Sequence, residues 1–301
     1  MTTPRAAVLM TLGAGALFGT AGTAQALGPT GSSPIAVAAL RLGLGGLVMA
    51  SLLPLLGHRF TEMRSCLRAP LVWLAALGSL FFQVLYFTGV DRAGVALGSL
   101  LAMGSIPVFA GLLGTLLGHR VTAAWTVATV VAVAGLGLLS LDGIGGGDVI
   151  GVLAALGSGL SGAIFVLSTK AIITRGLPAV PANIVSYLIA AVALLPAVIL
   201  APQSVSWLAS GAGVILALYI GFFAMALPNI LWVKGLGALS PGPSSTLMLA
   251  EPVVATTLGI VVLGEVLTFA GVIGLVLVLA GLLLQGISLT RSREAEPIAP
   301  L

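Results

Sequence analysis

The chain has 301 residues, of which 59% are hydrophobic and only 7% are charged, and its formal net charge is +4. Soluble domains carry about 25% charged residues, so this composition excludes a soluble enzyme or a nucleic-acid-binding domain. The one cysteine, Cys66, excludes an internal disulfide. Together these features predict an integral membrane protein.

Ten apolar stretches of about 20 residues follow one another, and each is long enough to cross a bilayer as a helix. In chain order they cover residues 5–27, 34–56, 70–90, 94–117, 122–141, 148–170, 181–200, 207–233, 243–263 and 269–288. The first stretch ends near Ala24-Gln25-Ala26, which resembles a signal-peptide cleavage site. Cleavage would leave nine spans and shorten the first half, so we predict that this stretch is retained.

Basic residues gather on one side of this ten-span topology. If the N-terminus is cytoplasmic, Arg92 lies in an outer loop and Arg41 lies within the second span, whereas every other Lys or Arg falls on the cytoplasmic side. The acidic residues of the outer side are Asp91, Asp142, Asp148 and Glu265. This positive-inside bias predicts a multi-pass protein of the bacterial cytoplasmic (inner) membrane with both termini in the cytoplasm. It predicts lipid as a partner, and neither nucleic acid nor an obligatory protein partner.

The chain contains one unit written twice. Residues 97–122 and 244–268 each contain a proline in mid-span, an apolar run and a Leu-Gly-x-x-x-Thr turn. We therefore predict an all-α fold with two five-helix repeats, residues 1–145 and 146–290, followed by a cytoplasmic tail, residues 291–301. Because five is odd, the second repeat must be inverted, which is typical of secondary transporters with a site between the halves. The alternative is a duplicated structural bundle that transports nothing.

Several short motifs carry a resemblance to a known family. They are Leu17-Phe18-Gly19-Thr20, Ala39-Leu40-Arg41-Leu42, Ile106-Pro107-Val108, Leu117-Gly118-His119-Arg120-Val121-Thr122, Leu231-Trp232, Leu249-Ala250-Glu251-Pro252-Val253-Val254 and Leu263-Gly264-Glu265-Val266-Leu267-Thr268. In this order and spacing the chain resembles the drug/metabolite transporter superfamily in its EamA-type ten-helix branch. The family commonly has Trp where Gly19 stands and an acidic residue where His119 stands, so roles attached to those side chains do not transfer.

The resemblance and the inverted repeats together predict a secondary transporter. We predict that it works by alternating access, in which half-helices move around a central site, and that it needs no cofactor. Within the branch the chain is most similar to bacterial exporters of the YddG type. That similarity implies export of amino acids, including aromatic and large apolar ones. Efflux of drugs or of other metabolites by the same fold is the alternative.

Polar and aromatic stripes at helical spacing predict which helices line the transport path, because polar side chains in a bilayer turn toward protein or water. The stripes occur in spans one, three and four and in their counterparts six, eight and nine. Spans two, five, seven and ten lack them, apart from Arg41, and are predicted to be scaffold. The alternative is that the small polar residues join helices together. The candidate cavity residues are Phe18, Gln25, Ser79, Phe82, Gln83, Tyr86, Ser99, Met103, Ser161, Phe165, Tyr219, Phe222, Asn229, Ser244, Met248 and Glu251.

Two prolines and two charges lie well inside predicted spans. Pro107 and Pro252 each remove a helical hydrogen bond near mid-bilayer, so we predict hinges there, with a static kink as the alternative. Glu251 has three open roles: it carries a proton, contacts a substrate amine or caps the helix beside Pro252. Arg41 extends toward the interface, pairs internally or binds a substrate carboxylate.

The competing class is an intramembrane enzyme. Gly159-Leu160-Ser161-Gly162 matches the surroundings of an intramembrane serine nucleophile, which needs a histidine base within reach. Both histidines, His58 and His119, fall in predicted cytoplasmic turns, so we predict that the chain is not an enzyme. The spacing of its His, Cys, Asp and Glu residues predicts no metal site, and no phosphate-binding loop motif is present.

Overall fold

The computed structural model of the chain describes residues 3–29, 33–141, 148–264 and 266–294. Throughout these ranges the regular structure is helical, as predicted. The first half contains α1 (Pro4–Ala26), α2 (Pro34–Ser51), the 3-10 helix η1 (Pro54–Leu56), α3 (Phe60–Cys66), α4 (Pro70–Ala93), α5 (Val95–Leu116) and α6 (Ala123–Leu139). Asp142 and Glu265, which we placed on the outer side, lie outside the described residues.

The second half is more interrupted. It contains α7 (Val149–Thr174), α8 (Ala179–Leu200), the 3-10 helix η3 (Pro202–Ala209), α9 (Gly211–Gly221), the π-helix η4 (Phe222–Ala226), α10 (Leu227–Ala238), α11 (Pro241–Leu247), α12 (Ala250–Leu263) and α13 (Phe269–Glu294). The eighth predicted span was wrong at both ends, because Pro202–Ala209 forms a separate 3-10 helix and the long helical segment runs from Gly211 to Ala238.

Many helices begin at residues whose side chains cap the free backbone N–H groups of the first turn. The hydroxyls of Thr3, Ser33, Thr122 and Ser210 accept hydrogen bonds from the N–H groups three residues ahead, as N-cap residues do. At the start of α7 the Asp148 carboxylate accepts from the Gly151 N–H at 3.2 Å. These caps explain why the helices start where the apolar runs begin.

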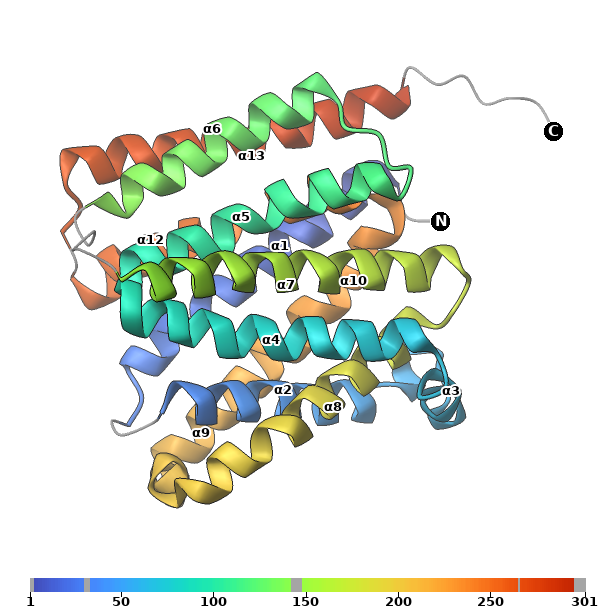
Figure 1. Cartoon of the computed structure of the whole chain (residues 1–301), viewed down its shortest axis with the longest axis vertical. Helices are drawn as coiled ribbons and strands as arrows, with labels where there is room; N and C mark the ends of the chain where they lie inside the picture. The colour runs from blue at the N-terminus through green and yellow to red at the C-terminus, as the bar shows by residue number, and fades with distance from the viewer. Residues whose placement is uncertain (1–2, 30–32, 142–147, 265, 295–301) are drawn as a thin grey trace.

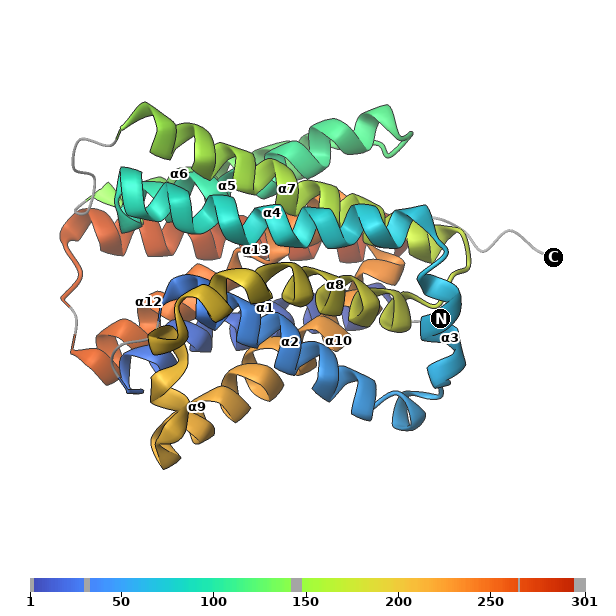
Figure 2. The ribbon, with the colours of Figure 1, turned by 60° about the horizontal axis from the view of Figure 1, so that its bottom comes forward.

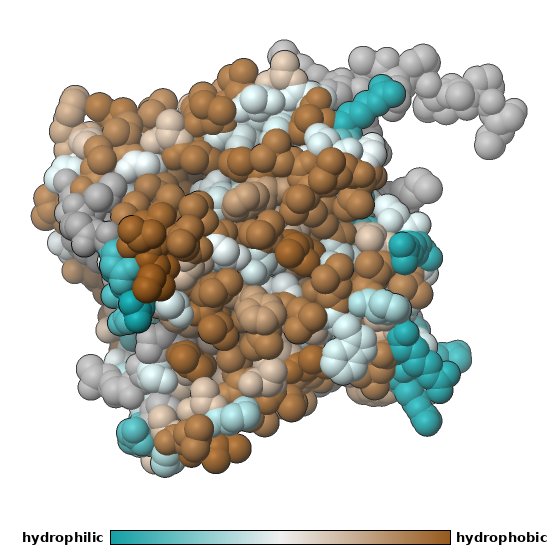
Figure 3. All heavy atoms as spheres, in the orientation of Figure 1, coloured by the Kyte–Doolittle hydropathy of each residue, from teal (hydrophilic) through white to brown (hydrophobic). Residues whose placement is uncertain are grey.

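Within the described residues, eight helical segments are long and apolar enough to cross a membrane. Two shorter apolar helices, Ile35–Ser51 and Ala123–Leu139, lie where the second and fifth spans were predicted. Apolar residues cover the face seen in Figure 3, and hydrophilic residues gather at the two ends of the helices. This distribution fits a bundle that crosses a bilayer.

The long helices run side by side, and α1 begins at the end of the bundle where α13 finishes (Figure 1). The same end carries α3, which lies in the basic loop between the second and third predicted spans (Figure 2). At the opposite end Arg92, on α4, donates to the Asp148 carboxylate at 3.0 Å. This hydrogen bond lowers the pKa of Asp148.

Helix packing is similar when the two halves are exchanged. The contact of α4 with α7 has a counterpart in α1 with α10, and the contact of α5 with α7 has one in α1 with α12. Three further contacts each join a helix to its own counterpart in the other half: α2 with α8, α5 with α11 and α6 with α13. In the last pair, an added Cβ at Gly135 would lie 2.6 Å from the Gly274 carbonyl oxygen, and one at Gly274 would lie 2.5 Å from the Gly135 carbonyl oxygen. Neither position has room for a side chain.

The two predicted hinge prolines have different surroundings. The helix α5 continues without interruption through Pro107, so no break accompanies this proline. In the second half the helix is interrupted between α11 and α12, and Pro252 lies in the first turn after the interruption. The break therefore precedes Pro252 instead of centring on it.

Candidate functional site

Two opposite charges lie deep in the helix bundle. Arg41 is on α2 and Glu251 is in the first turn of α12, and their charges attract each other through the interior. The two side chains do not approach within the 4.0 Å of a direct ion pair. Each is surrounded by protein yet keeps part of its surface accessible. Ionisable residues at such depth are costly, and in membrane proteins they mark functional sites.

Arg41 is incompletely satisfied. Its Nε atom is buried and has no hydrogen-bond partner, and its Nη2 donates one long bond, 3.4 Å, to the carbonyl oxygen of Ala224. A guanidinium has five N–H donors that suit a carboxylate. Since a buried polar group without a partner costs free energy, Arg41 has donors left for an anionic group.

The carbonyl of Ala224 is available because of a proline. In an α-helix it would accept from the N–H four residues ahead, but that residue is Pro228, which has none. The chain forms the π-helix η4 at this point, and π-turns inside α-helices are frequent at functional sites. A local feature of the eighth span thus positions the Arg41 side chain.

Tyr86 of α4 and Ser99 of α5 lie beside the two charges. The Tyr86 hydroxyl and the Ser99 Oγ are hydrogen-bonded at 3.0 Å, and Tyr86 interacts electrostatically with both Arg41 and Glu251. The Phe82 ring stacks on Tyr86 with 6.0 Å between the ring centres. An aromatic surface on α4 therefore lies within electrostatic range of the charged pair.

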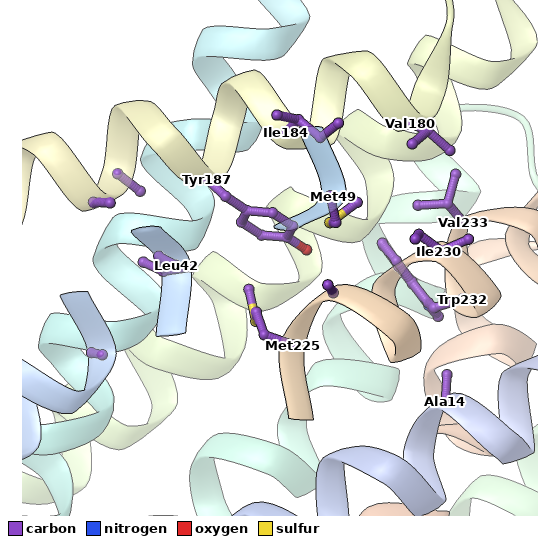
Figure 4. Packing of buried hydrophobic residues seen from close by; sticks show 14 of the residues in the cluster. Ala14, Leu42, Met49, Val180, Ile184, Tyr187, Met225, Ile230, Trp232 and Val233 are labelled. Atoms are coloured by element: carbon purple, nitrogen blue, oxygen red, sulfur yellow. The ribbon is translucent and has the colours of Figure 1, made fainter. Parts of the chain in front are cut away.

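Tyr187 of α8 approaches from the other side. Its hydroxyl donates to the Oδ1 of Asn229 on α10, and it interacts electrostatically with Arg41. Figure 4 shows its ring reaching from α8 toward the segment that carries Met225. The Phe165 ring packs between Tyr187 and Trp232, with centre separations of 5.5 and 5.4 Å. A second aromatic group thus joins α7, α8 and α10.

The break between α11 and α12 is held by close contact with α1. An added Cβ at Gly15 would lie 3.2 Å from the Met248 carbonyl oxygen, and one at Gly19 would lie 2.5 Å from the Glu251 carbonyl oxygen. No side-chain hydrogen bond caps the start of α12, so the cap that we considered for Glu251 is not formed. Its carboxylate still lies in the first turn, where the helix dipole favours negative charge.

The structure brings only part of the predicted cavity set together. Glu251 and Tyr86 lie within electrostatic range of Arg41, Ser99 and Phe82 contact Tyr86, and Phe165 and Asn229 belong to the second aromatic group. Phe18 and Met248 pack against the largest apolar core cluster, and Met103 packs against a smaller one. Ser244 is fully buried, and its hydroxyl has no partner.

The remaining predicted residues lie elsewhere. Ser79, Gln83 and Ser161 are buried, and Ser161 donates to the Gly157 carbonyl of its own helix. Gln25 is half-buried near the end of α1, where it donates to the Ala21 carbonyl at 3.4 Å. Tyr219 and Phe222 both contact Phe223, and 36% of Phe222 is exposed.

Sequence reasoning missed Tyr187 and Trp232. The seventh span was described as lacking a polar stripe, and this was wrong, because Asn183, Ser186 and Tyr187 of α8 are all buried. Asn183 and Ser186 bond α7 and α4, so the scaffold role stays a prediction. Their spacing of three and four residues was the signal that could have identified the inward face. Trp232 entered only as part of a motif, with no role assigned.

The described residues give no support to a metal or serine-protease site. No group of three or more His, Cys, Asp or Glu side chains comes together in the part of the chain that the structure describes. The Ser161 hydroxyl bonds a backbone carbonyl, and His58 lies in the loop before α3, where it contacts Glu62 at 2.8 Å. The charged group around Arg41 is therefore the strongest candidate site.

Comparisons with known proteins agree with a transporter. The family model described as "EamA-like transporter family" matches residues 5–141 and again residues 149–286. The chain is 37% identical over 290 residues to an uncharacterized transporter, YwfM, of Bacillus subtilis, covering 96% of each chain. It is 29% identical over 262 residues to an uncharacterized protein of Pseudomonas aeruginosa, covering 85% of this chain and 87% of the relative. One solved crystal structure shares the fold with a TM-score of 0.79 at 23% identity, over 96% of this chain and 99% of that chain.

Proposed function

Because this chain belongs to the EamA-like transporter family, a family of multi-pass membrane transporters, we propose that it exports small amphipathic metabolites, amino acids first among them. The site that we assign to the solute is the charged interior group around Arg41 and Glu251. Export occurs across the bacterial cytoplasmic membrane with both chain ends in the cytoplasm. The positive-inside distribution of Lys and Arg supports this orientation.

One observation carries the choice of amino acids: a cation and an anion inside the bundle lie within electrostatic range of each other without a direct ion pair. An amino-acid zwitterion has the complementary arrangement, since its carboxylate suits the Arg41 guanidinium and its ammonium suits Glu251. Bound between them, the solute supplies the opposite charge that each group lacks. A solute with a single charge would satisfy one group and leave the other uncompensated.

The aromatic rings favour amino acids with large apolar side chains. Phe82 and Tyr86 form one stacked surface, and Phe165, Tyr187 and Trp232 form another. Aromatic pairs in offset or edge contacts gain roughly 0.5–1.5 kcal/mol beyond burial alone. These surfaces support a preference for aromatic solutes of the kind that the resemblance to YddG-type exporters implies.

We propose alternating access between two inverted five-helix repeats as the transport mechanism. Support comes from helix packing that is similar when the halves are exchanged, and from a family model that matches each half once. In this mechanism α12 tilts at the break between α11 and α12, which lies directly before Glu251 and Pro252. In this proposal Pro107 is the corresponding bending point of the first half, although α5 is continuous there.

Counterflow in proteoliposomes tests the proposed substrate class. Vesicles loaded with unlabelled solute take up the same solute in labelled form. Phenylalanine carries both charges, phenethylamine carries only the positive charge and phenylpropionate carries only the negative charge. We expect uptake of phenylalanine alone. Preference for phenethylamine and other cationic amphiphiles would identify the protein as a drug efflux transporter, and no uptake of any solute by correctly folded protein would contradict transport of this class.

A second experiment separates proton antiport from facilitated diffusion. The same flux is measured with and without an imposed pH gradient, for the wild-type chain and for Glu251→Gln. Acceleration by the gradient in the wild type indicates proton coupling, and residual flux in Glu251→Gln that no longer responds to the gradient would assign the coupling proton to Glu251. If flux is indifferent to the gradient and survives Glu251→Gln, proton coupling through Glu251 is excluded.

A further inference from the structure

The short helix α3 presents a cationic face that the transport cycle proposed above does not use. Figures 1 and 2 show α3 at the end of the bundle where α1 begins, with its axis turned away from the direction of the long helices. Such an orientation is typical of a helix that lies in the membrane interface. It lies in the loop between the second and third predicted spans, which contains three arginines, Arg59, Arg64 and Arg68.

Four polar residues on one face of this segment line a shallow groove of about 370 Å³: Thr61, Arg64, Ser65 and Arg68. Thr61, Arg64 and Ser65 share one face of α3 by their spacing of three and four residues, and Arg68 follows in the turn directly after the helix. Arg64 and Arg68 are exposed. In the part of the chain that the structure describes, neither guanidinium makes a hydrogen bond or an ion pair.

The nearest acid does not neutralise this face. The Glu62 carboxylate accepts from the Arg59 backbone N–H at 3.1 Å and contacts the His58 ring at 2.8 Å. These bonds lower the pKa of Glu62, and the bond to His58 has the larger effect. They hold the carboxylate at the start of α3. The groove therefore keeps two uncompensated positive charges beside the Thr61 and Ser65 hydroxyls, of which the Ser65 hydroxyl donates to the Glu62 carbonyl oxygen at 2.7 Å.

The rest of the segment fits a bilayer surface. Cys66 is buried in a cluster with Ile172 of α7 and Val185 of α8, which anchors the inner face of α3. Beside the groove Phe60 and Leu67 are 58% and 46% exposed. Trp73, 48% exposed, donates its ring N–H to the Leu67 carbonyl at 2.8 Å. A tryptophan with a polar tip and an apolar ring is enriched at the level of lipid headgroups.

We propose that this groove binds the headgroup phosphate of an anionic phospholipid. Arg64 and Arg68 receive the phosphate charge, the Thr61 and Ser65 hydroxyls flank its oxygens, and the exposed Phe60 and Leu67 contact the acyl region. The apolar flank favours a lipid over free inorganic phosphate, which would gain nothing from it. This site is independent of the solute site around Arg41.

Native mass spectrometry of the delipidated full-length protein, titrated with phosphatidylglycerol or phosphatidylcholine, tests the proposal. We expect phosphatidylglycerol to be retained in preference and the double variant Arg64→Gln/Arg68→Gln to bind it roughly 30-fold more weakly, at about 1 kcal/mol for each arginine near the surface. Arg64→Lys/Arg68→Lys keeps the charge and is expected to retain most of the binding. The matched control is Arg120→Gln/Arg175→Gln, which removes two exposed arginines of other loops.

Two outcomes would overturn the proposal. Equal weakening of phosphatidylglycerol binding in the double variant and in the control, relative to the wild type, would mean that the lipid responds only to overall charge. Displacement of the lipid by inorganic phosphate that itself binds at the same arginines would make this a free-phosphate site. Thermal unfolding of each variant verifies that α3 stays packed, since its buried residues are unchanged.

Discussion

The guanidinium of Arg41 donates a hydrogen bond to the carbonyl oxygen of Ala224. Pro228, four residues further on, has no N–H to donate to that oxygen. The hydrogen bond of Arg41, in the second span, therefore depends on the missing N–H of Pro228 in the eighth span. The bond links α2 to the π-helix η4 and aims the guanidinium at the interior that Glu251 shares. The structure connects an apparent defect in one helix to the candidate site.

We expect Pro228→Ala to reduce transport while it leaves the fold intact. Alanine supplies the N–H that the Ala224 carbonyl lacks, so the helix regains a backbone bond and Arg41 loses its anchor. Counterflow of phenylalanine should fall about tenfold or more, the equivalent of roughly 1.4 kcal/mol in binding, without a lower melting temperature. Pro196→Ala is the control, because Pro196 is an exposed proline inside α8. Full flux in Pro228→Ala would refute the anchoring role.

Glutamine at Arg41 or at Glu251 should lower stability, and both changes together should restore much of it. Each single variant leaves one charge in the bundle without its opposite, which we expect to cost about 1–3 kcal/mol. The double variant Arg41→Gln/Glu251→Gln removes both charges, so the two losses should not add. Thermal unfolding in detergent measures this cycle.

Transport gives the opposite pattern in the same variants. Because a zwitterion needs both charges, flux should be lost in either single variant and stay lost in the double variant. Recovery of stability without recovery of flux would separate the functional role from the structural one. Strictly additive losses of stability would show that the two charges do not interact.

How much the sequence predicts differs between the fold and the site. Hydropathy located the helices well because each apolar run is bounded by caps, prolines or glycines with direct local effects. Arg41 and Glu251 could each be identified as candidate functional residues, because charged side chains are costly inside apolar spans. Their common location could not be identified, since it depends on how α2 and α12 pack against other helices. The π-helix was also invisible, because hydropathy has no signature for one extra residue in a turn.

Tyr187 and the interruption before Pro252 show two different limits. A single tyrosine in an apolar span can face lipid or the protein interior. The buried Asn183 and Ser186 show that this side of α8, with Tyr187, faces the interior. A proline announces a disturbed helix but does not locate it. The disturbance at α12 occurs where Gly15 and Gly19 let α1 approach the backbone, whereas α5 absorbs Pro107 without a break.

Gly19→Ala is expected to destabilise the protein by roughly 1–3 kcal/mol, as overpacking of a filled interior does. The new Cβ would lie 2.5 Å from the Glu251 carbonyl oxygen and 2.9 Å from the Val254 Cβ. Gly22→Ala on the same helix is the matched control, since nothing lies within 4 Å of its added Cβ. Melting temperatures of the two variants check the expectation. Equal effects would mean that α1 and α12 are not held in this close contact.

The start of α3 should loosen at acid pH. The Glu62 carboxylate is hydrogen-bonded to the His58 ring and to the Arg59 N–H, and these bonds lower the pKa of Glu62 in the folded protein. A lowered folded pKa contributes stability that is present above the unfolded value, 4.5, and is lost as the pH falls through the folded one. Hydrogen exchange of the peptide covering residues 57–69 should therefore show protection at neutral pH that decreases below that range. In Glu62→Gln this protection should already be reduced at neutral pH, because the amide carries no charge. If the two proteins show the same pH profile after correction for intrinsic exchange, Glu62 does not hold the start of α3.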